Sequence, residues 1–383
     1  MNRRAIAASA LALALPGCTH RTPQTSSTKP TAVAASSRDV PPDVPSATAS
    51  VPTAIPPTLP PPGPRTPVPT TFGAGPAWPR GSNTAAPAAY GAVLTRATAA
   101  VRSGGTLAPD LLLPRLDNND DSPLVMTPCG RQVRLRGTDV ALVAPGSGGS
   151  LPKQARDVVV LVDPGHGGGQ DGAIGIDGSR EADRVLALAR QVASRADARL
   201  GRVYLTRNRD IEESLAFRVA LGDSLRADVA VSVHLNAEPD GRLDRPGLET
   251  YGSLSNRAGR RLAGVLYEAQ RRFLQRKPGP WVGDRDAGAK YRIGRRGGDY
   301  YGLLRRAHVP WVISESMFVT SAHDLALLDQ PEFLAGLAGA IAGGIRSFAT
   351  SRAPGSGWVR PYQRRSDPAP APRREPPCVD PAR

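Results

Sequence analysis

Two histidines and two glutamates stand at places in this sequence where their side chains could act together. His166 follows the apolar run VVVLVD in the loop DPGHGG, and His234 lies near the end of DVAVSVHL. Glu315 ends the run HVPWVISE, and Glu181 opens the helical stretch EADRVLALAR. Because functional loops gather at the carboxyl ends of the strands in open α/β sheets, we expect these side chains at one edge of a sheet.

Residues of these types are suited to zinc chemistry. Two imidazoles and one carboxylate, with a fourth position open to water, hold Zn²⁺ in catalytic sites. A second carboxylate nearby can serve as a general base. Glycines around His166 allow a sharp turn and keep bulk away from an ion. The sequence therefore predicts one Zn²⁺, with Asp163 and Asn236 placed in sequence to support the histidines from a second shell.

Each residue alone has a simpler explanation. A carboxylate at Glu181 suits the positive end of a helix dipole, and His166 could be a loop histidine satisfied by backbone groups. Asp163 and Asn236 could equally cap strand ends. Only the combination favours a metal site over these ordinary roles.

Other chemistries fit the sequence less well. Residues 167–172 match GxGxxG, but a dinucleotide-binding loop must open a helix directly, and AIGIDGSR intervenes here. The phosphate-binding motif GxxxxGK[ST] does not occur. No serine stands in GxSxG, although three flank the key positions: Ser232, Ser314 and Ser316. Two further histidines are interpreted as structural or surface residues: His308 and His323.

The elements that must position the four residues alternate along the chain. Continuous apolar runs such as VVVLVD and DVAVSVHL are typical of parallel strands buried on both faces. Apolar residues recur at helical spacing between them, as in EADRVLALARQVASRADARL. This alternation predicts an α/β domain over residues 157–350, with a single mostly parallel sheet flanked by helices.

The remaining chain divides by composition. Residues 19–79 are rich in Pro, Thr and Ser and are predicted to be a disordered linker, and the Pro/Arg-rich residues 351–383 a disordered tail. Residues 80–155 form an extension or small β-rich subdomain of unknown role, in which 85–105 could be a helix and PLVMTPCGRQVRLRGTDVALVAP two or three strands. Whether Cys129 and Cys378 pair stays open.

Residues 1–18 have the layout of a secretory signal, with two arginines, an apolar stretch and small residues before Cys18. Leu-Pro-Gly-Cys resembles the lipobox of bacterial lipoproteins, so a lipid on Cys18 could attach the chain to a membrane. Export predicts the cell envelope, at the outer face of the plasma membrane or the cell wall. The net charge of +15 attracts polyanions, but export argues against nucleic acid.

Several segments together resemble a known family: VDPGHGG, SRE, VYLTRNRD, LAFRVALGD, ADVAVSVHLNA, GLETY and VPWVISESMFVTSAHDLALL. The stretch from Val158 to Phe348 is similar to the family-3 zinc-dependent N-acetylmuramoyl-L-alanine amidases of bacteria. The resemblance implies cleavage of the amide between N-acetylmuramic acid and L-alanine in peptidoglycan. It also implies the residue roles, with Glu315 as the catalytic carboxylate and three zinc ligands: His166, Glu181 and His234.

The sequence departs from this family in one loop. KPGPWVGDRDAGAKYRIGRRGGDYYGLLRRAH is longer and more basic than the usual segment. Its Arg292, Arg295 and Arg296 could bind stem-peptide carboxylates or anionic wall polymers, or could simply be solvated. The alternative function is a catalytically inactive, wall-binding lipoprotein on the same fold.

Overall fold

The computed structural model describes residues 86–96, 98–238, 247–277, 288–294, 297–358 and 377–382. The predictions for the signal, the linker, Cys18, Arg295 and Arg296 lie outside these residues.

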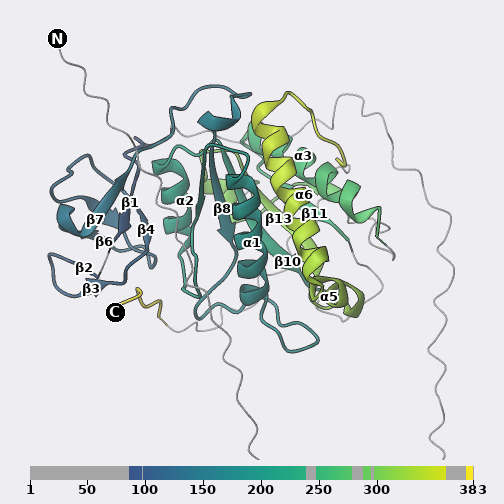
Figure 1. Ribbon diagram of the computed structural model, residues 1–383, viewed down its shortest axis with the longest axis horizontal. Helices are drawn as coiled ribbons and strands as arrows, with labels where there is room; N and C mark the ends of the chain where they lie inside the picture. Colours follow the sequence, from purple (N-terminus) through teal and green to yellow (C-terminus); the bar gives the residue numbers. More distant parts are fainter. Residues whose placement is uncertain are drawn as a thin grey trace, which may run out of the picture. The chain divides into compact units, whose positions relative to one another are not determined.

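The predicted α/β fold is confirmed (Figure 1). A six-stranded sheet has the order β12–β11–β13–β10–β8–β9. Strands β13, β10, β8 and β9 are parallel, whereas β11 runs antiparallel to β13. The strand bounds are β8 Val159–Pro164, β9 Arg202–Leu205, β10 Val229–Asn236, β11 Glu249–Gly252, β12 Gly288–Lys290 and β13 Trp311–Phe318.

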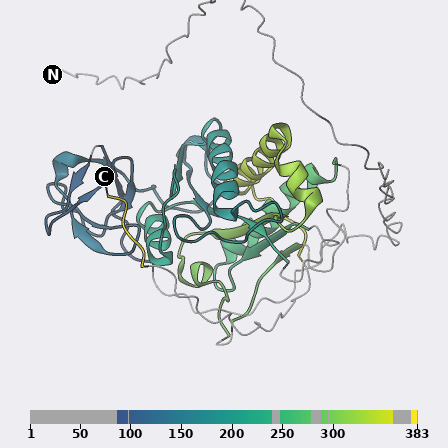
Figure 2. The same cartoon turned by 90° about the horizontal axis from the view of Figure 1, so that it is seen from below.

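Helices cover both faces of this sheet, and each face has its own apolar cluster. One cluster joins the sheet to α1 (Glu181–Asp197), α3 (Arg257–Leu274) and α6 (Pro331–Thr350). Figure 2 shows α1 and α6 together on one side of the sheet. The other cluster includes α2 (Leu215–Ser224) and α4 (Gly302–Arg306), and α5 (Ala322–Leu328) packs on α6. All six residues of β8 are buried, as its continuous apolar run predicts.

Within the described residues, α6 is long and apolar enough by composition to cross a membrane. Half of its most apolar window is buried inside the domain, where the helix packs on α1 and α3. A core helix therefore accounts for this composition.

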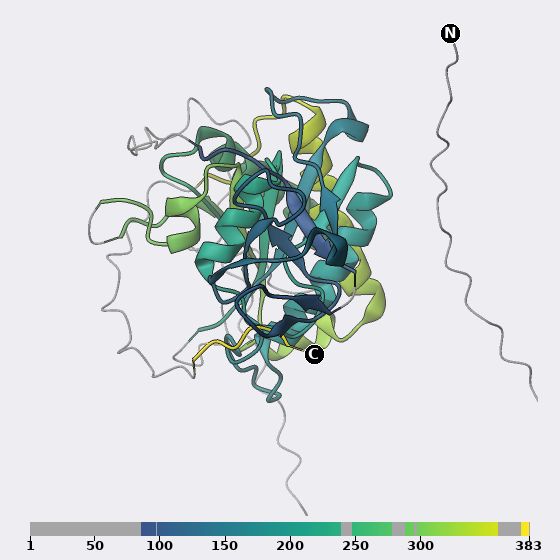
Figure 3. The same cartoon turned by 90° about the vertical axis from the view of Figure 1, so that its left-hand side faces the viewer.

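The N-terminal extension is built from short antiparallel strands, which face the viewer in Figure 3. Its three sheets are β4–β1–β7, β2–β3 and β5–β6. The bounds are β1 Ala92–Thr95, β2 Ala99–Ala100, β3 Thr106–Leu107, β4 Leu112–Pro114, β5 Leu124–Met126, β6 Gln132–Arg134 and β7 Val140–Val143, with 3₁₀ turns at Gly137–Asp139 and Ala155–Asp157. Strands β5, β6 and β7 confirm the strands predicted for this part of the chain.

The helix predicted over residues 85–105 is wrong. Strand β1 lies there instead and pairs with β4 on one side and β7 on the other. Gly91, Gly104 and Gly105 all have positive φ, which interrupts any helix through this stretch. The alanines that favour a helix locally are thus overridden by pairing with distant strands.

Cys129 and Cys378 form a disulfide, with their Cα atoms 5.6 Å apart. The Asp380 carboxylate accepts hydrogen bonds from the Cys129 backbone N–H (2.8 Å) and from Arg131 Nε (2.7 Å). The prediction of a disordered tail therefore fails for residues 377–382, because a covalent bond and an ion pair fix them to the extension.

We expect the Cys129→Ala/Cys378→Ala variant to lose about 2–4 kcal/mol of unfolding free energy, because the unfolded chain is then no longer cross-linked. Denaturant titration measures the loss. The oxidised wild type should fall to the level of the variant when reductant is added, and the variant should not respond. Equal stability of wild type and variant without reductant would show that the disulfide contributes nothing.

Candidate metal and catalytic site

Three of the four predicted residues meet at the carboxyl end of the parallel strands. His166 follows β8, Glu181 is the first residue of α1, and His234 lies in β10. Their ligand atoms all lie within 4.8 Å of one another, one atom from each residue. His166 has a φ of 57°, an unusual backbone conformation for a non-glycine residue, and it turns the chain sharply after the strand.

Glu181 is the centre of this cluster. Its Oε2 lies 3.1 Å from His166 Nε2, and its Oε1 lies 3.0 Å from His234 Nδ1. The backbone N–H groups of Ala173 and Leu235 donate to the same two oxygens. Burial alone would raise the pKa of Glu181, but the contacts with the two histidines lower it well below its usual range. The carboxylate is therefore ionised and fixed between two imidazoles.

The cluster fits a zinc ion. Two imidazole nitrogens and a carboxylate form a ligand set that Zn²⁺ uses in catalytic sites. Glycines clear the space around these groups: a Cβ on Gly165 would lie 2.2 Å from His234 Cε1, and one on Gly172 would lie 2.6 Å from Glu181 Oε2. Any larger residue at either position would displace a ligand.

Glu315 lies beside this cluster because of the strand register. It pairs with His234 across β10 and β13, and with Glu249 across β13 and β11. Glu315 Oε2 is buried and has no hydrogen-bond partner among the described residues. Burial raises the pKa of Glu315 to about 8, whereas a divalent cation in the neighbouring cluster would favour its ionised form.

Sequence reasoning missed a polar group next to Glu315. Glu249 is buried and accepts hydrogen bonds from Lys290 Nζ, Tyr251 Oη (2.7 Å) and Asn236 Nδ2 (2.9 Å). The motif GLETY contains this glutamate, but its role depends on β11 lying next to β13. Strand order of that kind cannot be read from local pattern.

Asp163 and Asn236 bond to other groups than the histidines that they were predicted to support. Asp163 accepts hydrogen bonds from Thr206 Oγ1, Ser232 Oγ and Arg218 Nη1. Asn236 donates to Glu249, as described above. Among the described residues, neither side chain therefore has a hydrogen bond to an imidazole, and their support of the histidines stays a prediction.

Two buried arginines hold the backbone of the His166 loop instead. Arg218 donates to the carbonyl oxygens of His166 (2.8 Å, from Nη2) and Pro164 (2.8 Å, from Nη1). Arg207 Nη2 donates to the carbonyl oxygen of Gly165 at 2.6 Å. A guanidinium presents several donors in a rigid fork, so each arginine fixes more than one point of its surroundings.

The basic loop is only partly described. Arg292 is half-buried, and its guanidinium lies 3.8 Å from the centroid of the Tyr300 ring. Arg295 and Arg296 fall outside the described residues. A substrate-binding role for these three residues stays a prediction.

Fold and site together describe an α/β protein with a candidate hydrolytic metal centre. Comparison with known families is consistent with this description. Residues 160–347 match the family of N-acetylmuramoyl-L-alanine amidases, and the chain belongs to this family of enzymes.

Individual relatives match the same region. The chain is 42% identical over 99 residues to the N-acetylmuramoyl-L-alanine amidase AmiC of Escherichia coli, a match covering 25% of this chain and 24% of AmiC. It is 32% identical to the endolysin of Bacillus phage SPP1 over 49% of this chain and 64% of that protein. The chain thus spans less than two thirds of either relative. A crystal structure of an amidase from Clostridium difficile matches 52% of this chain and 100% of its own, with 25% identity and a TM-score of 0.45.

We expect Arg218→Lys to weaken zinc binding roughly 10–100-fold, because lysine keeps the charge but loses the fork that holds the His166 carbonyl. A competition titration with a zinc chelator measures the affinity. The matched control is Arg202→Lys, since Arg202 also donates to two backbone carbonyls, those of Ala144 and Pro145, but lies beside Val159 at the opposite end of β8 from His166. Equal affinities in the two variants would contradict a role for Arg218 in positioning the ligands.

Stability should depend on pH through a buried acid next to Arg218. Burial raises the pKa of Glu213 to about 7, from an ordinary value of 4.5. The folded chain therefore binds this proton more tightly than the unfolded chain. The resulting stabilisation is full below about pH 4.5 and disappears as the pH rises through 7.

Glu213→Gln should consequently remove up to about 3 kcal/mol of the pH dependence between pH 4.5 and 8. Urea titrations across this range, with the surface substitution Glu332→Gln as control, measure the difference. Parallel pH profiles for wild type and Glu213→Gln would contradict a protonated Glu213 in the fold.

Proposed function

We propose that this chain is a zinc-dependent N-acetylmuramoyl-L-alanine amidase, which hydrolyses the amide bond between N-acetylmuramic acid and L-alanine in peptidoglycan. The observation that carries the proposal is the convergence of His166, Glu181 and His234, with Glu315 on the adjacent strand. Membership of the amidase family supports the choice of substrate.

The residues divide into two roles. His166, Glu181 and His234 would hold the zinc ion, which when bound lowers the pKa of a coordinated water and polarises the scissile carbonyl. Glu315 Oε2 accepts a proton from the attacking water and donates it to the nitrogen of the leaving L-alanine. The water oxygen bonds to the lactyl carbonyl carbon as the C–N bond breaks, so one carboxylate and one amine are released.

One oxygen of Glu315 is left without a hydrogen-bond partner among the described residues, as this role requires. Its unpartnered oxygen is free to bond to a water molecule or to the leaving nitrogen. On the neighbouring strand β11, Glu249 accepts hydrogen bonds from Tyr251 of the same strand and from Lys290 of β12, so its position beside Glu315 is fixed. The Glu315 carboxylate is thus held in place while its Oε2 has no hydrogen-bond partner among the described residues.

We further infer that the enzyme acts outside the cytoplasm. The layout of residues 1–18 supports export, and acylation of Cys18 would attach the mature chain to a membrane near the cell wall. The linker of residues 19–79 would let the catalytic domain reach peptidoglycan. A catalytically inactive wall-binding lipoprotein is the less favoured alternative, because all four residues of the site are retained.

Glu315→Gln should lower the rate of stem-peptide release from purified sacculi by about 10²–10⁴-fold, since the amide cannot accept the proton from water. Zinc content should remain that of the wild type, and Glu332→Gln on the surface of α6 should keep full activity. Near-wild-type release by Glu315→Gln would remove this residue from the mechanism. Absence of muramoyl-alanine cleavage in the zinc-loaded wild type would overturn the proposed function itself.

A further inference from the structure

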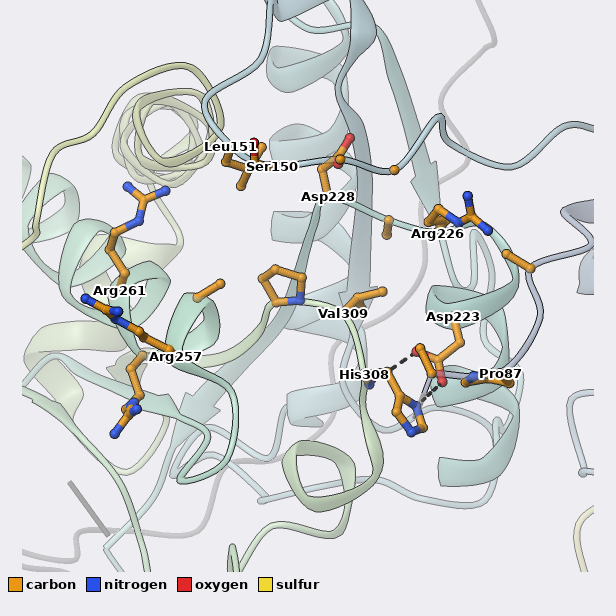
Figure 4. Close-up of a pocket in the computed structure, with 18 of the residues that line it drawn as sticks. Pro87, Ser150, Leu151, Asp223, Arg226, Asp228, Arg257, Arg261, His308 and Val309 are labelled. Carbon is orange, nitrogen blue, oxygen red and sulfur yellow. Dashed lines mark hydrogen bonds and ion pairs between the residues drawn. The ribbon is translucent and has the colours of Figure 1, made fainter. Parts of the chain in front are cut away.

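A cavity of about 1100 Å³ opens at the amino ends of the parallel strands, whereas the metal cluster lies at their carboxyl ends (Figure 4). Asp228 and Pro310, which line it, immediately precede β10 and β13, whereas His234 lies near the far end of β10. Glu315 is five strand residues from Pro310, and His234 is six from Asp228, which corresponds to about 16–20 Å. The cavity is therefore too far from Glu315 to be part of the catalytic site.

Acidic residues on the cavity wall already have polar partners within the protein. Asp228 pairs with Lys153 Nζ at 2.6 Å and accepts a hydrogen bond from the Val159 N–H. Asp223 accepts from His308, whose Nδ1 lies 2.8 Å away, as the dashed lines in Figure 4 show. Among the described residues, neither carboxylate is paired with an arginine of the cavity.

Arginines on the cavity rim carry charge that the protein does not balance. Arg226 and Arg257 lie on opposite sides of the cavity and are exposed (Figure 4). Among the described residues, neither side chain has a hydrogen-bond or ion-pair partner in the structure. Burial and the neighbouring Arg257 lower the pKa of Arg260, a third lining residue, and the first turn of α3 contains no acid.

Backbone geometry at Arg226 supports a use for its side chain. Arg226 follows α2 with a φ of 49°, a position where helices usually end in glycine. Gly148 leaves room for the arginine, since a Cβ there would lie 2.9 Å from Arg226 Cδ. Arg226 therefore occupies a position where glycine would be less strained, and the missing side chain of Gly148 leaves space for the arginine.

Between the arginines the lining is largely apolar. Leu151, Val309, Pro310 and Trp358 contribute to it. A pocket with an apolar surface and a few charged groups at its rim suits a ligand whose charges are separated by uncharged stretches. Guanidinium groups bind carboxylate and phosphate oxygens in paired hydrogen bonds.

We propose that this cavity is a second binding site, which takes an oxyanion-bearing segment of a cell-wall polymer. Arg226 and Arg257 contact carboxylate or phosphate groups of the polymer, and the apolar lining packs on the chain between them. The site rests on the proposed function for the choice of polymer. It would hold the enzyme on the wall while cleavage takes place at the other edge of the sheet.

The test compares full-length wild type with Arg226→Ala/Arg257→Ala. Arg199→Ala/Arg346→Ala is the matched control, because it also removes two exposed arginines. Co-sedimentation with sacculi is measured for the zinc-free proteins at increasing salt. Two kinds of sacculi are used: untreated ones, and ones stripped of phosphate polymers by acid. Cleavage of a soluble muramoyl-peptide is measured in parallel on the zinc-loaded proteins.

We expect the cavity variant to bind untreated sacculi about 10-fold more weakly and with a shallower salt dependence, because fewer counterions are released. The control variant should match the wild type, and all three proteins should cleave the soluble substrate equally. Weaker wild-type binding to stripped sacculi would identify phosphate as the ligand, and unchanged binding would identify carboxylate. Equal binding by the cavity variant and the control would overturn the site. If the zinc-loaded wild type does not cleave the soluble substrate, the proposed function is refuted. The binding comparison still tests the second site, because it is measured on zinc-free protein.

Discussion

The carboxylate of Glu181 is buried between two imidazoles that come from distant parts of the chain. A buried charge is stable only if it is paired and hydrogen-bonded. Glu181 accepts two hydrogen bonds from backbone N–H groups and contacts the imidazoles of His166 and His234. Displacing any one of these groups would leave a charge uncompensated inside the protein. The positions of β8, β10 and α1 are therefore tied to one another at this point.

The rest of the fold serves to keep these groups in register. Parallel pairing of β10 with β13 places Glu315 beside His234, and antiparallel pairing with β11 adds Glu249 on the other side. Arg207 and Arg218 fix the loop of His166 by donating hydrogen bonds to the backbone carbonyl oxygens of Gly165 and His166. The charge of Arg218 is balanced by the buried carboxylate of Asp163, so the site depends on a buried ion pair that lies behind the metal ligands.

Local pattern was sufficient to predict the catalytic half of the molecule. Continuous apolar runs ending in DPGHGG, SVHLNA and ISES identify buried parallel strands, and such strands have their carboxyl ends at one edge. That reasoning placed His166, His234 and Glu315 together without any knowledge of strand order. Glycine spacing likewise indicated a cleared loop, which the close approach of Gly165 to His234 confirms.

Features that depend on contacts between distant segments could not be predicted in this way. Residues 85–105 favour a helix by composition, yet β1 gains more by pairing with β4 and β7. Pairing of Cys129 with Cys378 joins residues 249 positions apart, and a Pro-rich tail carries no local sign of it. The bond between Lys290 and Glu249 arises only because β12 adds to the sheet edge next to β11.

Zinc K-edge X-ray absorption on protein loaded with one equivalent of Zn²⁺ would test the convergence of these ligands most directly. The account predicts two imidazole nitrogens at about 2.0–2.1 Å, with the remaining ligands oxygen. His234→Ala should reduce the imidazole count to one. A wild-type spectrum with fewer than two imidazoles, or with sulfur ligands, would contradict the account.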